Sequence, residues 1–460
     1  GTEAQGTHCR EGEAGHSVLL KGPTGDTLRS PTVSTKLQRI ASQAADYPQL
    51  VFTTLAHLID VEFLREAFHR INKRSSPGLD KVTARQYAED LEENLVDLHE
   101  RMRSGLYKAP PVVRVWLEKE DGKRRPIGKP TFEDKIVQRA VEMLLSAIYE
   151  QVFYDFSHGF RKGRSQHRAL YELDKQLWQL NIGWIVNADI TGLFDNLDHG
   201  HLRLFIRKRV NDGSIIRLIG KWLNAGVMEE GKLKYYEAGT PQGGVISPLL
   251  SNIFLHYVLD DWFVKEVKPR MRGRCFIIRW ADDFIIGCEL ESDARRIMAV
   301  LPKRFGRYGL SLHPEKTSII RFKRPRSGGG GKDRQNGTID FLGFTFYWAK
   351  SYRGYWVIKK KTARRRLARF MRVLWRWCKE NMHEPIQEQH QALCVKLRGW
   401  FRYHGVRNNY RALKAVFVCA GRAWRYWLSR RSSKGTVNCE KFDSLCVSYP
   451  LPRPRIIHNI

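Results

Sequence analysis

The hydrophobic pattern divides the chain into a helical first part, a centre of short apolar strands and a second helical part. From Leu37 to Met102, apolar residues recur at i, i+3 and i+4, which is typical of amphipathic helices. Residues 131–152, 198–225 and 292–308 repeat that spacing, whereas residues 185–190 form a short apolar run of strand length. Beyond the Phe341–Phe344 segment, which we expect to be a compact strand or turn, the pattern up to about residue 430 predicts helices.

Two segments predict β-hairpins. Residues 112–127 alternate Val113, Val115 and Leu117 on one arm and carry Asp121-Gly122 at the turn, a common hairpin signal. Residues 275–287 consist of two apolar arms that are interrupted by the adjacent pair Asp282-Asp283. The centre of the chain therefore combines strands with helices, which indicates an α+β fold.

Two segments lack this periodicity, and they suggest boundaries. Residues 1–33 are rich in Gly, Thr, Ser and Glu and predict a flexible leader. Residues 323–337 include four consecutive glycines and predict a mobile loop. We therefore expect a helical unit over 34–104, a central unit over 105–325, a basic helical unit over 326–430 and a short tail over 431–460.

The charge of the chain indicates a polyanionic partner. Lys and Arg number 79 against 48 Asp and Glu, and residues 351–440 alone contain 22 basic and four acidic residues. In that stretch basic and aromatic residues interleave, as a surface that follows phosphates and RNA shape requires. A solvated basic face over an aromatic core is the alternative, and it accounts for the tryptophans better than for the charge.

The cysteines and the lengths of the apolar runs exclude several classes. The eight cysteines are scattered without a CxxC pair, which argues against a zinc ribbon or a disulfide scaffold and fits a reducing cytoplasm. No apolar run approaches the ~20 residues that span a bilayer. We therefore expect no membrane partner and interpret the polyanion as nucleic acid.

The aspartates are the main candidates for chemistry. Asp282-Asp283 places two like charges inside an apolar hairpin, which is costly unless a divalent cation such as Mg²⁺ offsets the repulsion. Asp189 closes the apolar run of residues 184–190, and three such carboxylates suffice for two metal ions in phosphoryl transfer. For Asp189 alone, an ordinary role in a turn is the simpler interpretation.

Three further elements predict a nucleotide pocket. Phe194 follows Asp189 closely enough to wall a sugar site, although a core phenylalanine is the better interpretation of that residue alone. Lys119 and Arg125 lie in the basic hairpin, where they either clamp a triphosphate or form a solvated turn. Gln242 lies in the loop Thr240-Pro241-Gln242-Gly243-Gly244, which either contacts a ligand or only starts a helix.

The order of these motifs resembles the reverse transcriptases that group II introns encode, also called maturases, from about residue 50 to 430. The resemblance rests on the residues already named and on further matching segments: Ser76-Pro77-Gly78-Leu79-Asp80, Asp121–Gly128, Ser157–Ser165, Ser247–Asn252, Leu310–Thr317 and Phe341–Phe344. It implies a right-hand polymerase of the α+β class. Fingers and palm would occupy 105–325, with 34–104 as a fingers extension, 326–430 as a thumb and maturase region, and 431–460 as a tail with a DNA-binding remnant.

The resemblance also implies roles for individual residues. Catalysis falls to Asp189, Asp282 and Asp283, which with Ile190 would hold two Mg²⁺ ions, or Mn²⁺ in their place. The dNTP would meet Lys119, Arg125, Gln242 and Phe194, the last as the gate that excludes a 2′-hydroxyl. The remaining assignments are a primer and template set (Trp280, Lys316, Phe341, Leu342, Gly343) and an RNA-binding set (Arg364, Arg365, Arg366, Arg398, Arg402).

The chain departs from the family pattern at a few positions. Trp280 stands where the family usually has the Tyr of Tyr-Ala-Asp-Asp, so an aromatic ring remains but the hydroxyl is lost. Lys162 and Lys129 replace a usual Pro and a usual apolar residue. Without paired cysteines near the C-terminal end, we expect no HNH endonuclease and no second-strand cleavage by this chain.

The implied function is RNA-templated DNA synthesis together with help in splicing and retrohoming of the intron. The implied partners are group II intron RNA, an RNA template, a DNA primer or target, and dNTPs; a homodimer is also compatible. A location in the bacterial cytoplasm, at the nucleoid, would follow. Two alternatives remain open: a splicing-only maturase with reduced polymerase activity, and a domesticated reverse transcriptase that serves repair or phage defence.

Overall fold

The structure is a computed structural model. It describes residues 32–118, 124–229, 232–235, 238–239, 243–325, 336–432 and 436–460, and of Arg125 only the backbone. Nearly all of the predicted leader, most of the predicted mobile loop, and the site candidates Lys119 and Gln242 therefore lie outside the described residues.

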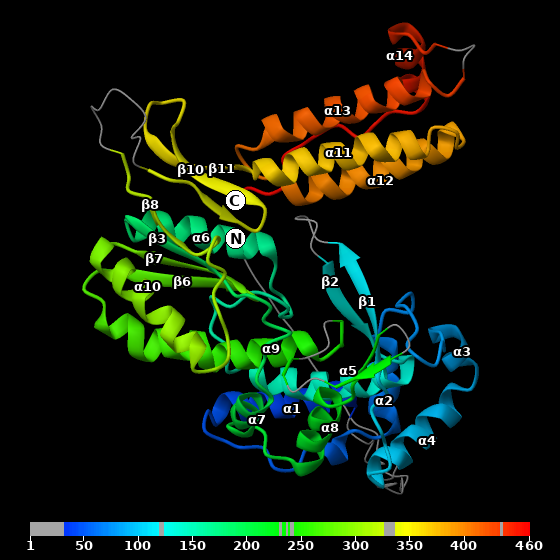
Figure 1. Ribbon diagram of the computed structural model, residues 1–460, viewed down its shortest axis with the longest axis vertical. Coiled ribbons are helices and arrows are strands. Elements are labelled where there is room, and N and C mark those ends of the chain that lie inside the picture. Colours follow the sequence, from blue (N-terminus) through cyan, green and yellow to red (C-terminus); the bar gives the residue numbers. More distant parts are fainter. Residues whose placement is uncertain are drawn as a thin grey trace, which may run out of the picture.

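The first helices pack around one long buried helix, α5 (Phe132–Tyr149). It is covered by α1 (Val33–Asp46), α2 (Val61–His69), α3 (Ala84–Glu89) and α4 (Leu91–Arg103), which are blue in Figure 1. Hydroxyl or carboxylate side chains at the residue before α1, α2, α3 and α5 accept backbone N–H bonds there, which explains where these helices begin. The helical spacing predicted for residues 37–102 and 131–152 is confirmed.

A four-stranded antiparallel sheet in the order β6-β7-β3-β8 forms the centre. Its strands are β3 (Trp184–Asp189), β6 (Cys275–Trp280), β7 (Asp283–Cys288) and β8 (Ser318–Arg321). Alternate residues face α6 (Gln166–Gln179) on one side and α10 (Glu291–Gly306) on the other, so both faces are buried. This burial on both sides explains why these strands read as continuous apolar runs.

A second sheet carries the predicted basic hairpin. Its order is β2-β1-β4-β5, built from β1 (Val112–Glu118), β2 (Arg124–Lys129), β4 (Val227–Glu229) and β5 (Lys232–Lys234). Between β3 and β4 lie α7 (His199–Arg207) and α8 (Gly213–Leu223), and α9 (Ser247–Leu255) follows β5. The hairpin predicted over residues 112–127 is confirmed.

A third sheet corrects the prediction of helices directly after Phe344. It has the order β11-β10-β9, with β9 (Ile339–Phe341), β10 (Phe344–Lys350) and β11 (Trp356–Thr362). The run of three lysines at 359–361 hid the alternation of buried and exposed positions that marks a strand. Lys360 is buried, and its Nζ lies 2.8 Å from Asp174 Oδ2. Lys359 and Lys361 lie on the other face of the sheet. Aromatic and β-branched residues along both strands favour this pairing.

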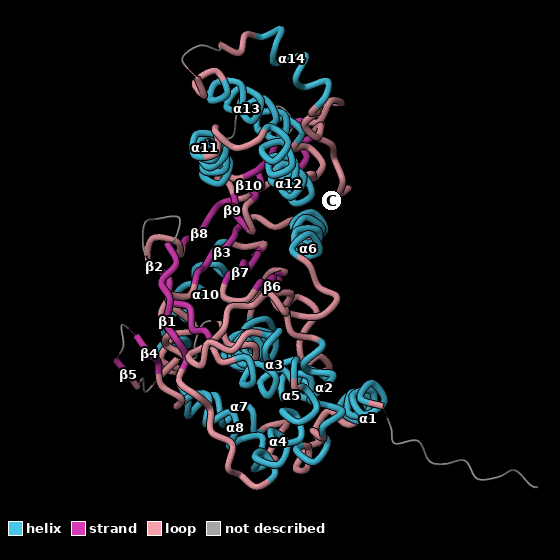
Figure 2. The backbone as a smooth tube through the Cα atoms, turned by 90° about the vertical axis from the view of Figure 1, so that its right-hand side faces the viewer, coloured by secondary structure: helices cyan, strands magenta, loops and turns pink. Residues whose placement is uncertain are grey.

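A helical bundle completes the molecule. It comprises α11 (Arg364–Glu380), α12 (Ile386–His404), α13 (Tyr410–Leu428) and α14 (Cys439–Ser448). In the segment expected to be a tail, Phe442 of α14 packs edge-on against Trp424, and the backbone N–H groups of Ile457 and His458 donate to Gly405 O. Figure 2 shows the bundle at one end, the central sheet in the middle and the first helices at the other end. Among the described residues, none of the helices combines the length and apolarity that crossing a bilayer requires.

Candidate active site

Strand pairing brings two of the three candidate aspartates face to face. In the β3–β7 ladder Asp189 is the direct partner of Asp283, and Asp282 lies in the two-residue turn that joins β6 to β7. Ile190, whose side chain is buried, continues from β3 and bridges to Leu312. The backbone positions of Asp189, Asp282 and Asp283 therefore lie near one another at the same end of the sheet.

The electrostatics of this end favour a cation. Burial, together with the charges of Asp189 and Asp282, raises the pKa of Asp283 to about 7, against the opposing effect of Lys316 and Arg366. Lys316 Nζ lies 2.7 Å from Asp189 Oδ2. Lys316, which the resemblance assigns to the primer and template, thus contacts a candidate metal ligand.

The donor set fits a divalent metal ion by its chemistry. Carboxylate oxygens are the ligands that hard cations prefer, and a cation there would relieve the repulsion that raises the pKa of Asp283. In the described part of the chain, no three His, Cys, Asp or Glu side chains converge as a ready-made metal-ligand group. A metal ion that binds Oδ2 of Asp189 would compete with Lys316 for that oxygen.

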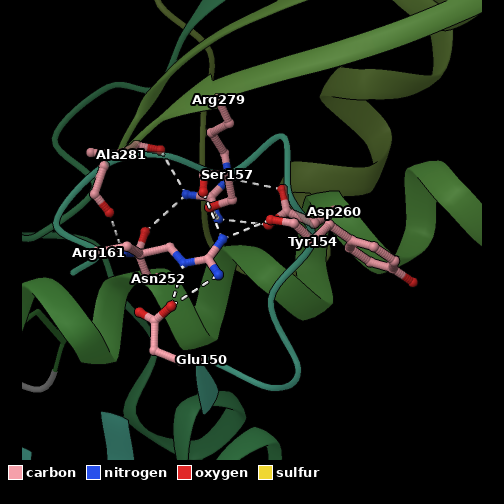
Figure 3. A network of polar contacts seen from close by, with 9 residues as sticks. Glu150, Tyr154, Ser157, Arg161, Asn252, Asp260, Arg279 and Ala281 are labelled. Atoms are coloured by element: carbon pink, nitrogen blue, oxygen red, sulfur yellow. Dashed lines mark hydrogen bonds and ion pairs between the residues drawn. The ribbon is translucent and has the colours of Figure 1, made fainter. Parts of the chain in front are cut away.

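A buried ion pair supports the Asp-Asp turn from below. Arg279 and Asp260 are both fully buried, with Nε–Oδ1 and Nη2–Oδ2 distances of 2.8 and 2.6 Å (Figure 3). Arg279 also donates to Ala281 O, Asn252 Oδ1 and Ser157 Oγ at 2.8–3.0 Å. Ala281 has a φ of 55°, a left-handed backbone that costs a non-glycine residue about 1–2 kcal/mol. The Arg279 bond to its carbonyl helps to hold that conformation.

The segment that follows Phe156 packs directly against the same turn. A Cβ on Gly159 would lie 2.4 Å from Ala281 N, so only glycine fits, and Gly159 O accepts a bond from Asn252 Nδ2 at 2.7 Å. Sequence reasoning noted the Ser157–Ser165 motif without finding this role. One feature of the sequence could have revealed this buried network. Arg279 is the single charged residue inside the apolar run of β6, and a buried arginine needs a buried partner.

A cavity of about 470 Å³ lies between the loop that follows β3 and the basic hairpin. Its lining includes Phe194 and Asp195 on one side and Arg114, Trp116 and Arg124 on the other. Phe194 is therefore placed at a pocket wall and not only in the core. Arg114 and Trp116 were not predicted, because alternation along β1 had been used only for its apolar side.

Two glycines flank the segment that carries Gln242, and both pack closely against residues that line this cavity. A Cβ on Gly239 would lie 2.7 Å from Asp195 O, and one on Gly243 would lie 2.5 Å from Gly128 O; both glycines have positive φ. The residues before and after the loop thus contact opposite walls of the cavity. Gln242 and Lys119 themselves are not described, and Arg125 is described only as the backbone partner of Leu117.

The Phe341–Phe344 turn joins β9 to β10 and contacts the helical bundle. Leu342 and Gly343 both have positive φ, and Leu342 O accepts a bond from Tyr403 Oη at 2.7 Å. Arg366 lies against Gly343, since a Cβ there would be 2.7 Å from Arg366 Nη1. Arg366 therefore borders the candidate active site, whereas Arg364, Arg365, Arg398 and Arg402 are exposed on α11 and α12.

Trp280 ends β6 opposite Asp283 and is partly buried.

Comparison with known proteins agrees with this geometry. A family model described as reverse transcriptase (RNA-dependent DNA polymerase) matches residues 117–346, half of the chain. Group II intron-encoded protein LtrA of Lactococcus lactis is 38% identical over 239 residues, 51% of this chain and 39% of that protein. Protein YkfC of Escherichia coli is 37% identical over 325 residues, 62% of this chain and 84% of that protein.

A plant relative extends the comparison. Nuclear intron maturase 2, mitochondrial, of Arabidopsis thaliana is 30% identical over 193 residues, 33% of this chain and 26% of that protein. The match to LtrA, like the match to this maturase, thus spans less than half of the relative's length. The chain belongs to the reverse transcriptase (RNA-dependent DNA polymerase) family.

Proposed function

We propose that the chain is an RNA-directed DNA polymerase encoded by a group II intron, and that it also binds the intron RNA and assists splicing and retrohoming. The observation that carries the polymerase proposal is the direct pairing of Asp189 with Asp283, next to Asp282, at one end of a sheet beside a cation-lined cavity. In-line phosphoryl transfer requires such a cluster of carboxylates close to a nucleotide pocket.

The residues divide the chemistry between them. Reverse transcriptases use divalent metal ions; we propose two Mg²⁺ ions, held by Asp189, Asp282, Asp283 and the backbone of Ile190, which would stabilise the charge that develops during transfer. Phe194 would exclude the 2′-hydroxyl. Lys119, Arg125 and Gln242, with Arg114 and Arg124, would hold the triphosphate and sugar, because guanidinium groups bind phosphates through two parallel bonds.

The nucleic-acid partners follow from charge and from family membership. We propose that Trp280, Phe341, Leu342 and Gly343 position the primer end, and that the exposed arginines of α11 and α12 contact intron RNA. Arg364 and Arg365 support this, because cations at a helix N-terminus oppose the helix dipole and are stabilised by a polyanion. Such partners would place the protein in the cytoplasm, at the nucleoid.

Primer extension on an RNA template with Mg²⁺ tests the polymerase proposal, and splicing of the flanking intron tests the maturase proposal. Splicing without extension would favour the splicing-only alternative. Extension by a chain whose flanking DNA does not fold into intron domains would favour a domesticated enzyme in repair or phage defence. An inactive protein in both assays would contradict the proposal as a whole.

Replacing Phe194 with alanine is expected to raise ribonucleotide incorporation relative to deoxyribonucleotide incorporation by about 10-fold or more, because a steric clash of ~1.4 kcal/mol already gives that factor. The ratio of kcat/KM for a dNTP and the matching NTP measures this. Phe194→Tyr keeps the ring and should retain wild-type selectivity. If Phe194→Ala leaves the ratio unchanged, another residue excludes the 2′-hydroxyl.

Replacing Arg364 and Arg365 with glutamine is expected to weaken RNA binding and to lower its salt dependence. Each lost phosphate contact removes about 0.7–0.9 from the slope of log K against log salt, so the pair should remove about 1.5. The matched control exchanges Arg295 and Arg296, which are also adjacent and exposed but lie on α10. A slope equal to that of the control would show that Arg364 and Arg365 do not face the RNA.

A further inference from the structure

The tip of the β10–β11 hairpin presents two tyrosines to solvent. Tyr352 is fully exposed, with a relative accessibility of 107%, and Tyr355 retains 67%. Both lie between Lys350, the end of β10, and Trp356, the start of β11. A single exposed aromatic residue is ordinary, but two on one short turn, apart from the candidate active site, form a distinct surface.

Hydrogen bonds make this turn rigid. Ser351 N donates to Tyr355 O at 2.7 Å, Gly354 N donates to Ser351 O at 3.1 Å, and Tyr355 N donates to Ser351 Oγ at 3.1 Å. Gly354 has a φ of +80°, the left-handed conformation that glycine adopts at little cost. The backbone that carries the two tyrosines is thus ordered before a ligand arrives, which reduces the entropy lost on binding.

The surroundings of the tip are cationic. From Phe341 to Lys379 the sequence contains twelve Lys and Arg and no Asp or Glu. Arg353 lies between the two tyrosines, Lys350 Nζ lies 5.7 Å from the centre of the Trp356 ring, and Lys359 Nζ donates to Lys350 O at 2.8 Å. A ligand with aromatic faces and negative charge complements this surface, and unpaired nucleic acid has both.

The hairpin also sets the distance of the tip from the candidate active site. It starts directly after the Phe341–Phe344 turn, and at about 3.3 Å per residue the seven residues of β10 carry the tip roughly 20 Å away. In Figure 1 the tip is the yellow loop at the upper left, extending away from the bundle of α11, α12 and α13. A nucleic-acid strand bound at the Phe341–Phe344 turn would therefore have to extend roughly 20 Å further to reach the tip.

We propose that this tip, Lys350–Trp356, is a stacking site for unpaired RNA bases. Tyr352 and Tyr355 provide the faces on which bases stack, and Lys350 and Arg353 contact the neighbouring phosphates. The proposal rests on the proposed function in one respect, namely that the partner is RNA. It assigns the tip no part in catalysis.

The test compares two double variants of the full chain. Tyr352→Ala with Tyr355→Ala removes both rings, while Tyr352→Phe with Tyr355→Phe keeps them and removes only the hydroxyls. The probes are a labelled unstructured RNA oligonucleotide, the DNA of the same sequence, and an RNA–DNA duplex. The alanine variant is expected to bind the single-stranded RNA about 10- to 100-fold more weakly, and the phenylalanine variant to stay within about two-fold of wild type. Duplex binding, thermal stability and incorporation of one nucleotide on a short primer–template should not change.

Four outcomes would overturn the proposal. These are unchanged RNA binding by the alanine variant, an equal loss in both variants, an equal loss for the DNA oligonucleotide, and a loss of binding to vesicles of anionic lipid in place of RNA. The second would assign the contact to the hydroxyls, and the last would make the tip a membrane-contact site. Because these assays measure binding, they stand apart from primer extension: a wild-type chain that binds RNA through the tip but extends no primer would contradict only the polymerase.

Discussion

Replacing Asp282 and Asp283 together with asparagine is expected to lower primer extension by about 10³-fold or more, because metal coordination supplies several kcal/mol of transition-state stabilisation. The fold should survive the change. Asparagine has nearly the same shape as aspartate, and it removes the like charges that face Asp189 across the β3–β7 ladder.

In the absence of metal and at neutral pH, Asp283→Asn should make the protein more stable than wild type. The pKa of Asp283 is raised to about 7, so the folded state binds a proton more tightly than the unfolded chain, whose carboxyl titrates near about 4. This group therefore costs the wild-type protein stability as the pH rises from about 4 to about 7. Thermal melts in EDTA should show that loss in wild type and a smaller one in Asp283→Asn.

The matched control is Glu291→Gln, which makes the same acid-to-amide change at the exposed first turn of α10. It should alter neither extension nor its dependence on metal. Extension by the double variant at a rate close to wild type would remove these aspartates from the catalytic site, whatever the family membership of the chain.

Replacing Asp260 with alanine is expected to destabilise the protein by about 3–5 kcal/mol, because it leaves the buried guanidinium of Arg279 without its partner. Urea denaturation measures this directly. Extension should fall as well, since Arg279 also holds the carbonyl of Ala281 in the Asp-Asp turn. The effect on activity should remain at temperatures where the variant is fully folded.

A double replacement separates stability from positioning. Arg279→Met with Asp260→Leu removes both charges and fills similar volume, a change that is often neutral for stability. It should recover much of the stability lost in Asp260→Ala, yet extend primers poorly because the bonds to Ala281, Asn252 and Ser157 are gone. If it regains full activity, the ion pair serves stability alone.

Sequence reasoning found the elements whose signals are local. The two apolar arms around Asp282-Asp283 predicted the β6–β7 hairpin, and the apolar run that ends at Asp189 predicted β3. Only the resemblance to a known family indicated that β3 and the β6–β7 hairpin lie side by side. No local pattern in the sequence specifies that Asp189 pairs with Asp283. The roles of these residues stay proposals, which the substitutions above test.

What the sequence concealed depends on contacts between distant residues. In the sequence, Asp260 is an ordinary polar position. Only the structure shows that it bonds to Arg279, 19 residues later in the chain. Tyr403, whose hydroxyl bonds to Leu342 O across 61 residues, carried no signal within its own helix. The lysines of β11 were read as a charge cluster because the burial of Lys360 depends on Asp174, far away in α6.

The number of residues in the π-helical segment after α9 determines whether two partners of Arg279 face the same way. Two π-helical turns, His256–Asp260 and Phe263–Val267, follow α9, and Asn252 and Asp260 both bond to Arg279. In a regular α-helix, side chains eight residues apart point about 80° away from each other, and the wider π turn reduces that angle. Deleting one residue between Asn252 and Asp260 would leave a separation of seven residues, which in a regular α-helix is only about 20° from alignment, whereas inserting one would turn Asp260 away from Arg279 although every contacting residue is retained. Insertions should therefore be tolerated less well than deletions in this segment, even where single substitutions are accepted.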